Sequence, residues 1–258
     1  MRLMKKFWGA AAALVLSASL LVGCSSGTAS SVPVSASSAA ESTVSSVEET
    51  ASSAVDENEA AAAQLLNDLT GSYQELWPVI LADEYKQTWL DDCTALVGED
   101  NAEAAFEKLS SMVTGDVYGE DAVKAYANGG GAYFCGFTNS LATLTFDGET
   151  STISGTDKDG NVLFSHTYHY IGMEPVRGLY EFESDDADSG EFTYFFLAPD
   201  TSAETYHIEF RYGSDAEALS QYDAGEYAYW LASGISTDCD QTMIDNCIEL
   251  FCTENLAG

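Results

Sequence analysis

Three histidines limit the places where this chain can bind a metal ion or move a proton. His166 and His169 are three residues apart in a run typical of a strand, so their side chains point to opposite faces and are expected to be packed or hydrogen-bonded. His207 and Glu209 are two apart in another such run, which places both side chains on one face with Cβ atoms roughly 7 Å apart. This pair can share a cation, and Asp200, in the preceding turn, is the candidate third ligand.

A second interpretation of the same segment needs no metal. Arg211 shares the polar face of Glu209, so the two can form an ion pair on a solvated strand while Tyr206, Ile208 and Phe210 fill the core. The sequence contains no G-x-S-x-G nucleophile motif, and no pair of carboxylates stands out in so acidic a chain. We therefore do not expect an enzyme.

Five cysteines follow Cys24, an odd number, so at least one thiol has no partner within the chain. None of their spacings matches a C-x-x-C metal site, which argues against a zinc-thiolate centre. We expect them in the core or in disulfides, whose pairing the spacing leaves undetermined. They are Cys93, Cys135, Cys239, Cys247 and Cys252.

The period of the apolar residues changes from 3.6 to 2 after the glycines at 129–131, which predicts strands in the second half of the chain. The predicted strands cover residues 141–146, 161–171, 179–183, 191–198 and 205–212, with turn-forming residues between them. Short strands without intervening helices favour an antiparallel sheet that closes, or nearly closes, into a barrel.

Apolar residues three or four apart predict helices on both sides of these strands. They begin near Asp56, continue over residues 75–81, 84–97 and 102–113, and return over residues 238–256. The expected fold class is therefore α+β: one domain of about 200 residues, mainly an antiparallel β-barrel, with N-terminal helices and a C-terminal helix.

The first 24 residues have the three parts of an export signal: a cationic start, an apolar run, and small residues before a cysteine. Residues 20–24 resemble the lipobox of bacterial lipoproteins, which implies cleavage before Cys24 and a lipid, such as palmitate, on that residue. We expect residues 1–23 to be a signal peptide and residues 24–55 a lipidated, Ser-rich, disordered linker. Residues 56–258 would then be a folded domain at the extracellular face of the cell membrane.

The charge of the chain is strongly negative. Cleavage would leave six Lys and Arg against 42 acidic residues, a formal charge of −36. Such a field repels nucleic acid and attracts cations without selecting one of them. The expected partners are a divalent metal ion and the membrane, through the lipid anchor, and not nucleic acid.

Several stretches resemble, in order, segments of the ZinT (YodA) family of zinc-binding proteins. Residues 71–80 are similar to the family's opening G-x-W-Q-S-x-Y-P-x-L segment, and residues 122–126 to the helix before its sheet. Residues 166–172 resemble its Y-x-Y-x-G strand, residues 177–183 its R-G-V-R-Y-L-F-E strand, and residues 207–219 its H-F-H-I-F-x-G…E-A-L segment. The resemblance covers roughly residues 70–256 and implies a calycin- or lipocalin-like barrel with flanking helices.

Members of this family bind zinc mainly through three histidines, of which this chain keeps one. One alignment register places the ligand positions on Asp200, His207 and Glu209, an oxygen-rich set that would bind zinc less tightly than three imidazoles. The other register places Thr205 and Phe195 at two of them. His207 would then be the sole ligand, and the metal function would be lost.

The resemblance implies a surface lipoprotein that binds a divalent metal ion, with zinc as the expected ion, for uptake or homeostasis. A metal ABC transporter is the expected protein partner. The alternative is a barrel that has lost the ion and holds an apolar or glycan ligand among Tyr168, Tyr170, Tyr194 and Phe196.

Overall fold

The computed structural model describes residues 57–113, 118–125, 133–200 and 202–256, all within one compact unit that runs from Ser45 to Gly258. The expected signal peptide, the lipid on Cys24 and the expected linker lie outside the described residues and stay predictions. No helix in the described part of the chain has both the length and the apolar character needed to cross a bilayer.

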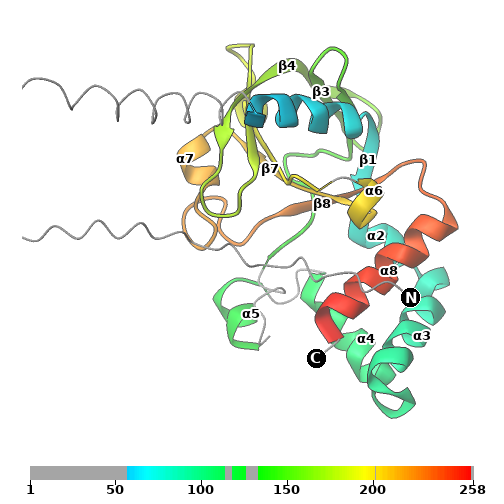
Figure 1. Ribbon diagram of the computed structural model, residues 1–258. Coiled ribbons are helices and arrows are strands. Elements are labelled where there is room, and N and C mark those ends of the chain that lie inside the picture. Colours follow the sequence, from blue (N-terminus) through cyan, green and yellow to red (C-terminus); the bar gives the residue numbers. More distant parts are fainter. Residues whose placement is uncertain (1–56, 114–117, 126–132, 201, 257–258) are drawn as a thin grey trace, which may run out of the picture. The chain divides into compact units, whose positions relative to one another are not determined.

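Eight antiparallel strands form a closed barrel, in which each strand pairs with its neighbour in sequence and β1 pairs with β8 (Figure 1). The strands are β1 (Gly71–Glu75), β2 (Thr143–Asp147), β3 (Thr152–Thr156), β4 (Val162–Met173), β5 (Tyr180–Ser184), β6 (Tyr194–Leu197), β7 (Ile208–Gly213) and β8 (Ala232–Ser236). The predicted class, α+β with a mainly antiparallel barrel, is confirmed.

The inside of the barrel is a packed aromatic core. Successive side chains of a strand point to opposite faces, so the even positions of β7 enter the barrel while the odd positions face outward. Phe210 and Tyr212 are both 0% exposed, and each stacks on Phe195 of β6. The barrel therefore fixes which side of β7 carries Glu209.

Three strands are absent from the sequence prediction, namely β1, β3 and β8. Residues 75–81 were expected to form a helix, but the helix is shorter and β1 precedes it. β3 and β8 are rich in small residues and each contains a glycine at a tight contact. An added Cβ would lie 2.4 Å from Leu141 at Gly155, and 3.2 Å from Ile208 at Gly234. Small residues there allow close packing and weaken the alternating pattern.

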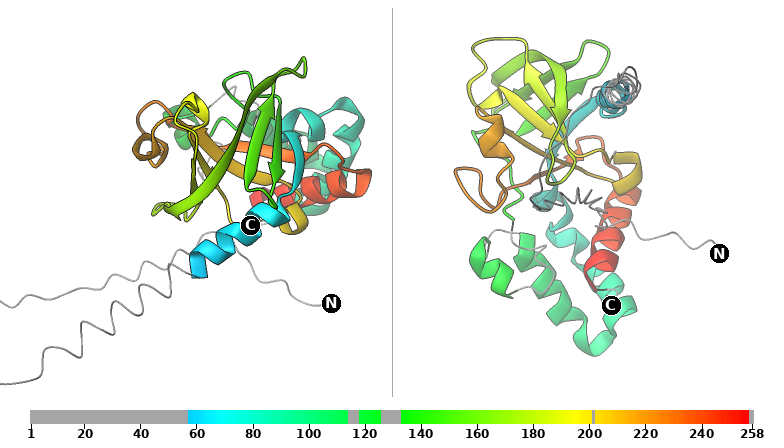
Figure 2. Two further views of the ribbon diagram at one scale, coloured as in Figure 1. Left: turned by 90° about the horizontal axis from the view of Figure 1, so that it is seen from above. Right: turned by 60° about the vertical axis from the view of Figure 1, so that its left-hand side comes forward.

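Most of the helices form a second layer with its own core, while two short ones, at residues 190–192 and 216–219, pack on the barrel instead. Their bounds are α2 (Leu76–Ile80), η1 (Asp83–Tyr85), α3 (Lys86–Val97), α4 (Glu99–Val113), α5 (Glu120–Ala125), η3 (Gly190–Phe192), α6 (Ser202–Thr205), α7 (Ala216–Leu219) and α8 (Gln241–Leu256). Trp89 of α3 is 0% exposed in this core and donates from Nε1 to the carbonyl of Ile80 at 2.7 Å. Figures 1 and 2 show α6 lying against α8.

Residues 57–68 form a further helix, whose apolar face packs on the barrel core (Figure 2). Leu65 and Leu66 follow Ala62 by about one turn on this face, and all three are at most 4% exposed. The β2–β3 turn approaches the helix so closely that a Cβ at Gly148 would lie 2.4 Å from the Cα of Asn67. Glycine is required there because the approach leaves no room for a side chain.

Candidate metal site

His207 lies between α6 and β7, one residue before the strand begins. The preceding residue, Tyr206, has a φ of 65°, a left-handed conformation that turns the chain out of α6 and into the strand. The sequence prediction placed His207 on the strand itself. The structure instead places it at the mouth of the barrel, beside the helical layer.

A backbone hydrogen bond fixes the orientation of the imidazole ring. Nδ1 of His207 lies 2.7 Å from the carbonyl oxygen of Thr205. A carbonyl oxygen only accepts hydrogen bonds, so Nδ1 must carry the proton and donate it. In the neutral ring, Nε2 then has a free lone pair, which is the state in which histidine ligates a metal.

Glu209 is the outward-facing residue of β7 closest to that lone pair. Its Oε1 lies 3.9 Å from Nε2 of His207, and the two side chains are 35% and 20% exposed, respectively. The predicted side-by-side placement of imidazole and carboxylate is confirmed. The alternative pairing of Glu209 with Arg211 is wrong, because Arg211 is 0% exposed and its guanidinium donates to the backbone carbonyls of Leu219, Gln221 and Tyr227.

The pair shifts both pKa values in the directions expected for an ion pair. Burial lowers the pKa of His207, but the contacts with Cys247 and with Glu209 outweigh burial, so the pKa lies well above its ordinary value. Burial raises the pKa of Glu209, but His207 outweighs it and lowers the pKa. Without a metal, the site therefore favours a protonated imidazole beside a carboxylate.

Further carboxylates surround this pair. Loss of water around the Asp200 carboxyl, followed by the charges of Glu204 and Glu209, raises the pKa of Asp200. Burial likewise raises the pKa of Glu254 on α8, and the charges of Glu209 and Asp200 add to this rise while that of His207 opposes it. Like charges that raise one another's pKa values mark a place where an added cation would be stabilised.

The structure brings the three predicted ligands into one neighbourhood but not into a closed ligand shell. His207 and Glu209 are in contact, and Asp200 lies close enough for its charge to act on the pair and for theirs to act on it. Within the described ranges, no three side chains of His, Cys, Asp or Glu are close enough together to hold an ion. Asp200 would have to move to complete such a site.

Sequence reasoning missed the contribution of α8. The Sγ atom of Cys247 on α8 lies 4.0 Å from Nδ1 of His207. Glu254 lies about two helical turns further along the same face of α8. The spacing of seven residues between them is the signal that places both on one helix face. Nothing in the sequence indicates that this face meets His207.

The other two histidines have carboxylate partners of their own. Nδ1 of His166 lies 2.7 Å from Asp186, and Nδ1 of His169 lies 2.8 Å from Asp185. The expectation that both are hydrogen-bonded is confirmed. Their partners come from the turn after β5, away from the segment that holds His207.

All five cysteines in the described residues are free thiols. Cys93 of α3 and Cys252 of α8 are both 0% exposed, and their thiols interact with each other. Burial, and then the charge of Glu209, raise the pKa of Cys135 to about 12. A thiol with so high a pKa is a poor metal ligand because ligation requires the thiolate.

The aromatic residues proposed for the alternative function are part of the packed core or lie at its edge. Tyr168 and Phe196 are 3% and 0% exposed within it, and Tyr170 and Tyr194 pack against it half-buried. The hydroxyl of Tyr168 donates to the carbonyl of Phe192 at 2.5 Å. These four residues therefore stabilise the barrel.

No protein-family model and no curated protein matches this sequence. Among solved structures, the chain is similar to the Zn(II)-bound ZinT-like domain of AdcA from Streptococcus pneumoniae, with 16% identity and a TM-score of 0.45 over 72% of this chain and 89% of that domain. It is also similar to Zn(II)-bound AdcA from the same organism, with 16% identity and a TM-score of 0.41 over 75% of this chain and 35% of the other. These values do not assign the chain to a family, so its function must be argued from its own residues.

Proposed function

We propose that this chain is an extracytoplasmic lipoprotein that binds a divalent metal ion for uptake or homeostasis, with zinc as the expected ion. His207, Glu209 and Asp200 are the proposed ligands. A lipid on Cys24 would hold the domain at the extracellular face of the cell membrane. From there the ion would pass to a metal ABC transporter.

The orientation of His207 is the observation that carries the proposal. Because Nδ1 donates to the carbonyl of Thr205, the lone pair of Nε2 is the one left for a metal. Nε2 and Oε1 of Glu209 are 3.9 Å apart, too far for a direct hydrogen bond. In a tetrahedral zinc site two ligand atoms lie about 3.3–3.5 Å apart, so these two would have to approach by only about half an ångström to share an ion. The gap is therefore open for an ion after a small movement of either side chain.

The surrounding charge supports a cation at the same place. Asp200 and Glu254 both have raised pKa values, first because of burial and then partly because the charge of Glu209 acts on both and that of Asp200 acts on Glu254. A divalent ion would reduce this repulsion and draw Asp200 into contact. One nitrogen and two carboxylate ligands bind zinc and also suit harder ions such as manganese or calcium.

Calorimetric titration of the purified chain with zinc tests the proposal. We expect a dissociation constant in the micromolar range or tighter, and at least a tenfold loss of affinity in His207→Ala, because losing even an outer-shell partner of a ligand typically costs about 10- to 100-fold. His169→Ala is the matched control, since it removes a histidine that faces Asp185 instead. Zinc affinity no tighter than millimolar, or unchanged in His207→Ala, would refute the metal function.

Two carboxylate variants test the ligand set separately from the function. Asp200→Asn is expected to weaken zinc binding because it alters a proposed ligand. Glu254→Gln is expected to change zinc affinity by less, because Glu254, on α8, is not one of the proposed ligands. The reverse order would leave the metal function standing and show that α8, rather than the turn before α6, completes the site.

A further inference from the structure

A cavity of about 460 Å³ lies in the described part of the chain, and none of the proposed metal ligands lines it. Five aromatic side chains form much of its wall: Tyr118, Phe134, Tyr227, Tyr229 and Trp230. This volume is within the range of pockets that hold small organic molecules. The cavity is therefore large enough for a ligand much bigger than a metal ion.

The charged residues of this pocket are all acidic. Glu191 and Glu226 line it, and no Lys, Arg or His is among its described lining residues. Glu191 accepts hydrogen bonds from the hydroxyls of Tyr227 at 3.1 Å and Ser214 at 3.3 Å, both neutral donors. None of the ion pairs between described residues involves Glu191 or Glu226. The pocket therefore has negative charge that the described residues leave unbalanced.

The floor of the pocket belongs to the barrel core, where Trp230 and Tyr227 are 6% and 8% exposed. The indole Nε1 of Trp230 donates to the carbonyl of Gly136 at 2.8 Å, and the ring packs edge-on against Tyr212 of the barrel core. Tyr118, in contrast, is 54% exposed, a large aromatic surface without a place in either core. The wall thus combines a fixed floor with an open aromatic side.

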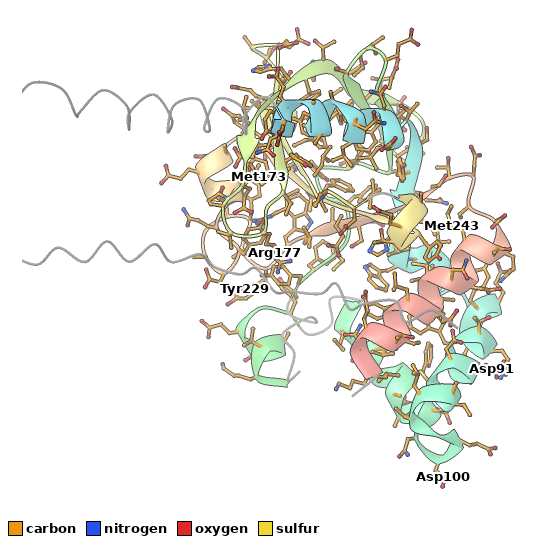
Figure 3. The ribbon with its side chains drawn as sticks, in the orientation of Figure 1. Asp91, Asp100, Met173, Arg177, Tyr229 and Met243 are labelled. Carbon is orange, nitrogen blue, oxygen red and sulfur yellow. The ribbon has the colours of Figure 1, made fainter. Side chains whose placement is uncertain are left out.

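The backbone of the pocket is unusual at two positions. Tyr229 has a φ of 54° and Asn139 a φ of 53°, so both adopt the left-handed conformation that residues with a side chain rarely take. Tyr229 is held on both sides, donating from its N–H to Tyr222 and accepting at its carbonyl from Phe134. Such conformations gather at ligand-binding sites, where the surrounding structure imposes them. Figure 3 shows Tyr229 on the side of the barrel that faces α5.

We propose that this pocket is a second binding site, and that its ligand is a small quaternary ammonium compound of the choline type. Aromatic faces carry negative partial charge and attract cations, above all methylated ammonium groups, which need no hydrogen bonds. Glu191 and Glu226 add full charges, and the strongly negative chain draws cations to its surface. A ligand with one positive charge and no negative one fits this wall best.

Titration of the purified full chain with choline, with EDTA present so that metal binding plays no part, tests the proposal. We expect saturable binding, and roughly tenfold weaker binding of 3,3-dimethylbutanol, which has the same shape without the charge. Phosphocholine, the form carried by lipids and polymers, is expected to bind more weakly than choline because its phosphate meets the two carboxylates. No binding up to about 10 mM choline, or equal binding of the uncharged analogue, would overturn the proposal.

Variants on the exposed rim identify the site without disturbing the core. Tyr118→Ala and Glu226→Gln are each expected to weaken choline binding several-fold, because both side chains are exposed and line the pocket. Glu149→Gln, in the exposed β2–β3 turn, is the matched control for the general charge of the chain and is expected to bind like the parent. Tighter binding of phosphocholine, putrescine or N-acetylglucosamine than of choline would assign the pocket to another ligand class and refute the proposal.

Discussion

The buried guanidinium of Arg211 should be among the most sensitive polar groups of the domain. It is 0% exposed and donates to three backbone carbonyls in the segment that follows β7, those of Leu219, Gln221 and Tyr227. Its plane also lies 4.3 Å from the ring centre of Tyr222. The substitution Arg211→Met keeps the length and apolar stem of the side chain but removes every one of these donors.

The size of the effect follows from what the substitution leaves behind. Each buried carbonyl without a donor costs about 1–3 kcal/mol, and the cation–π contact adds about 1–2 kcal/mol. Part of this sum returns because the charge no longer has to be buried, and one of its donors, Nε, has no partner among the described residues. A net loss of about 3–5 kcal/mol is expected, a large fraction of the roughly 5–15 kcal/mol that stabilises a typical domain.

Urea unfolding followed by tryptophan fluorescence measures this loss. Arg177→Met is the matched control: the guanidinium of Arg177 lies over the rings of Tyr133 and Tyr222, at 4.6 and 4.8 Å from their centres, but it is exposed. Figure 3 shows Arg177 near Tyr229 at the same side of the barrel. We expect the control to lose at most about 1 kcal/mol. Equal losses in both variants would show that stacking, and not the carbonyl hydrogen bonds, gives Arg211 its role.

Two further predictions concern the metal site and the membrane. The raised pKa of His207 gives stability that is present below about pH 6.5 and lost as the pH rises through the folded pKa, while the lowered pKa of Glu209 gives stability that is present above about pH 4.5 and lost as the pH falls through its folded pKa. The stability difference between the parent and Glu209→Gln, in EDTA, should therefore be largest between these values; a difference independent of pH would refute the coupling. Cys24→Ala should move the protein from the membrane fraction to the medium, and unchanged membrane association would refute the lipid anchor.

The barrel was predictable from sequence where strands alternate between apolar and polar residues, and not where close contacts replace alternation. β4 and β7 show the period clearly. The glycines of β3 and β8 reflect contacts with residues distant in sequence, so the pattern there is weak. Gly148 lies in the turn between β2 and β3, and the approach of Asn67 that makes glycine necessary there is a tertiary contact.

The candidate site divides in the same way. The spacing of His207 and Glu209 within one segment was enough to predict that their side chains meet. Cys247 and Glu254 approach them from α8, through the packing of the helical layer against the barrel, and local spacing holds no information about that approach. The burial of Arg211 was missed for the same reason, because its carbonyl partners lie in α7 and in the irregular segment after it.

Closure of the barrel joins the two ends of the domain. Tyr73 of β1 pairs with Ser236 of β8, residues roughly 160 positions apart, so closing the barrel requires a loop of almost the whole domain. Contacts of such separation form slowly and only after both partners are available. A chain that emerges from its N-terminus presents β1 first and β8 last, so the barrel stays open until its final strand is available to pair with its first.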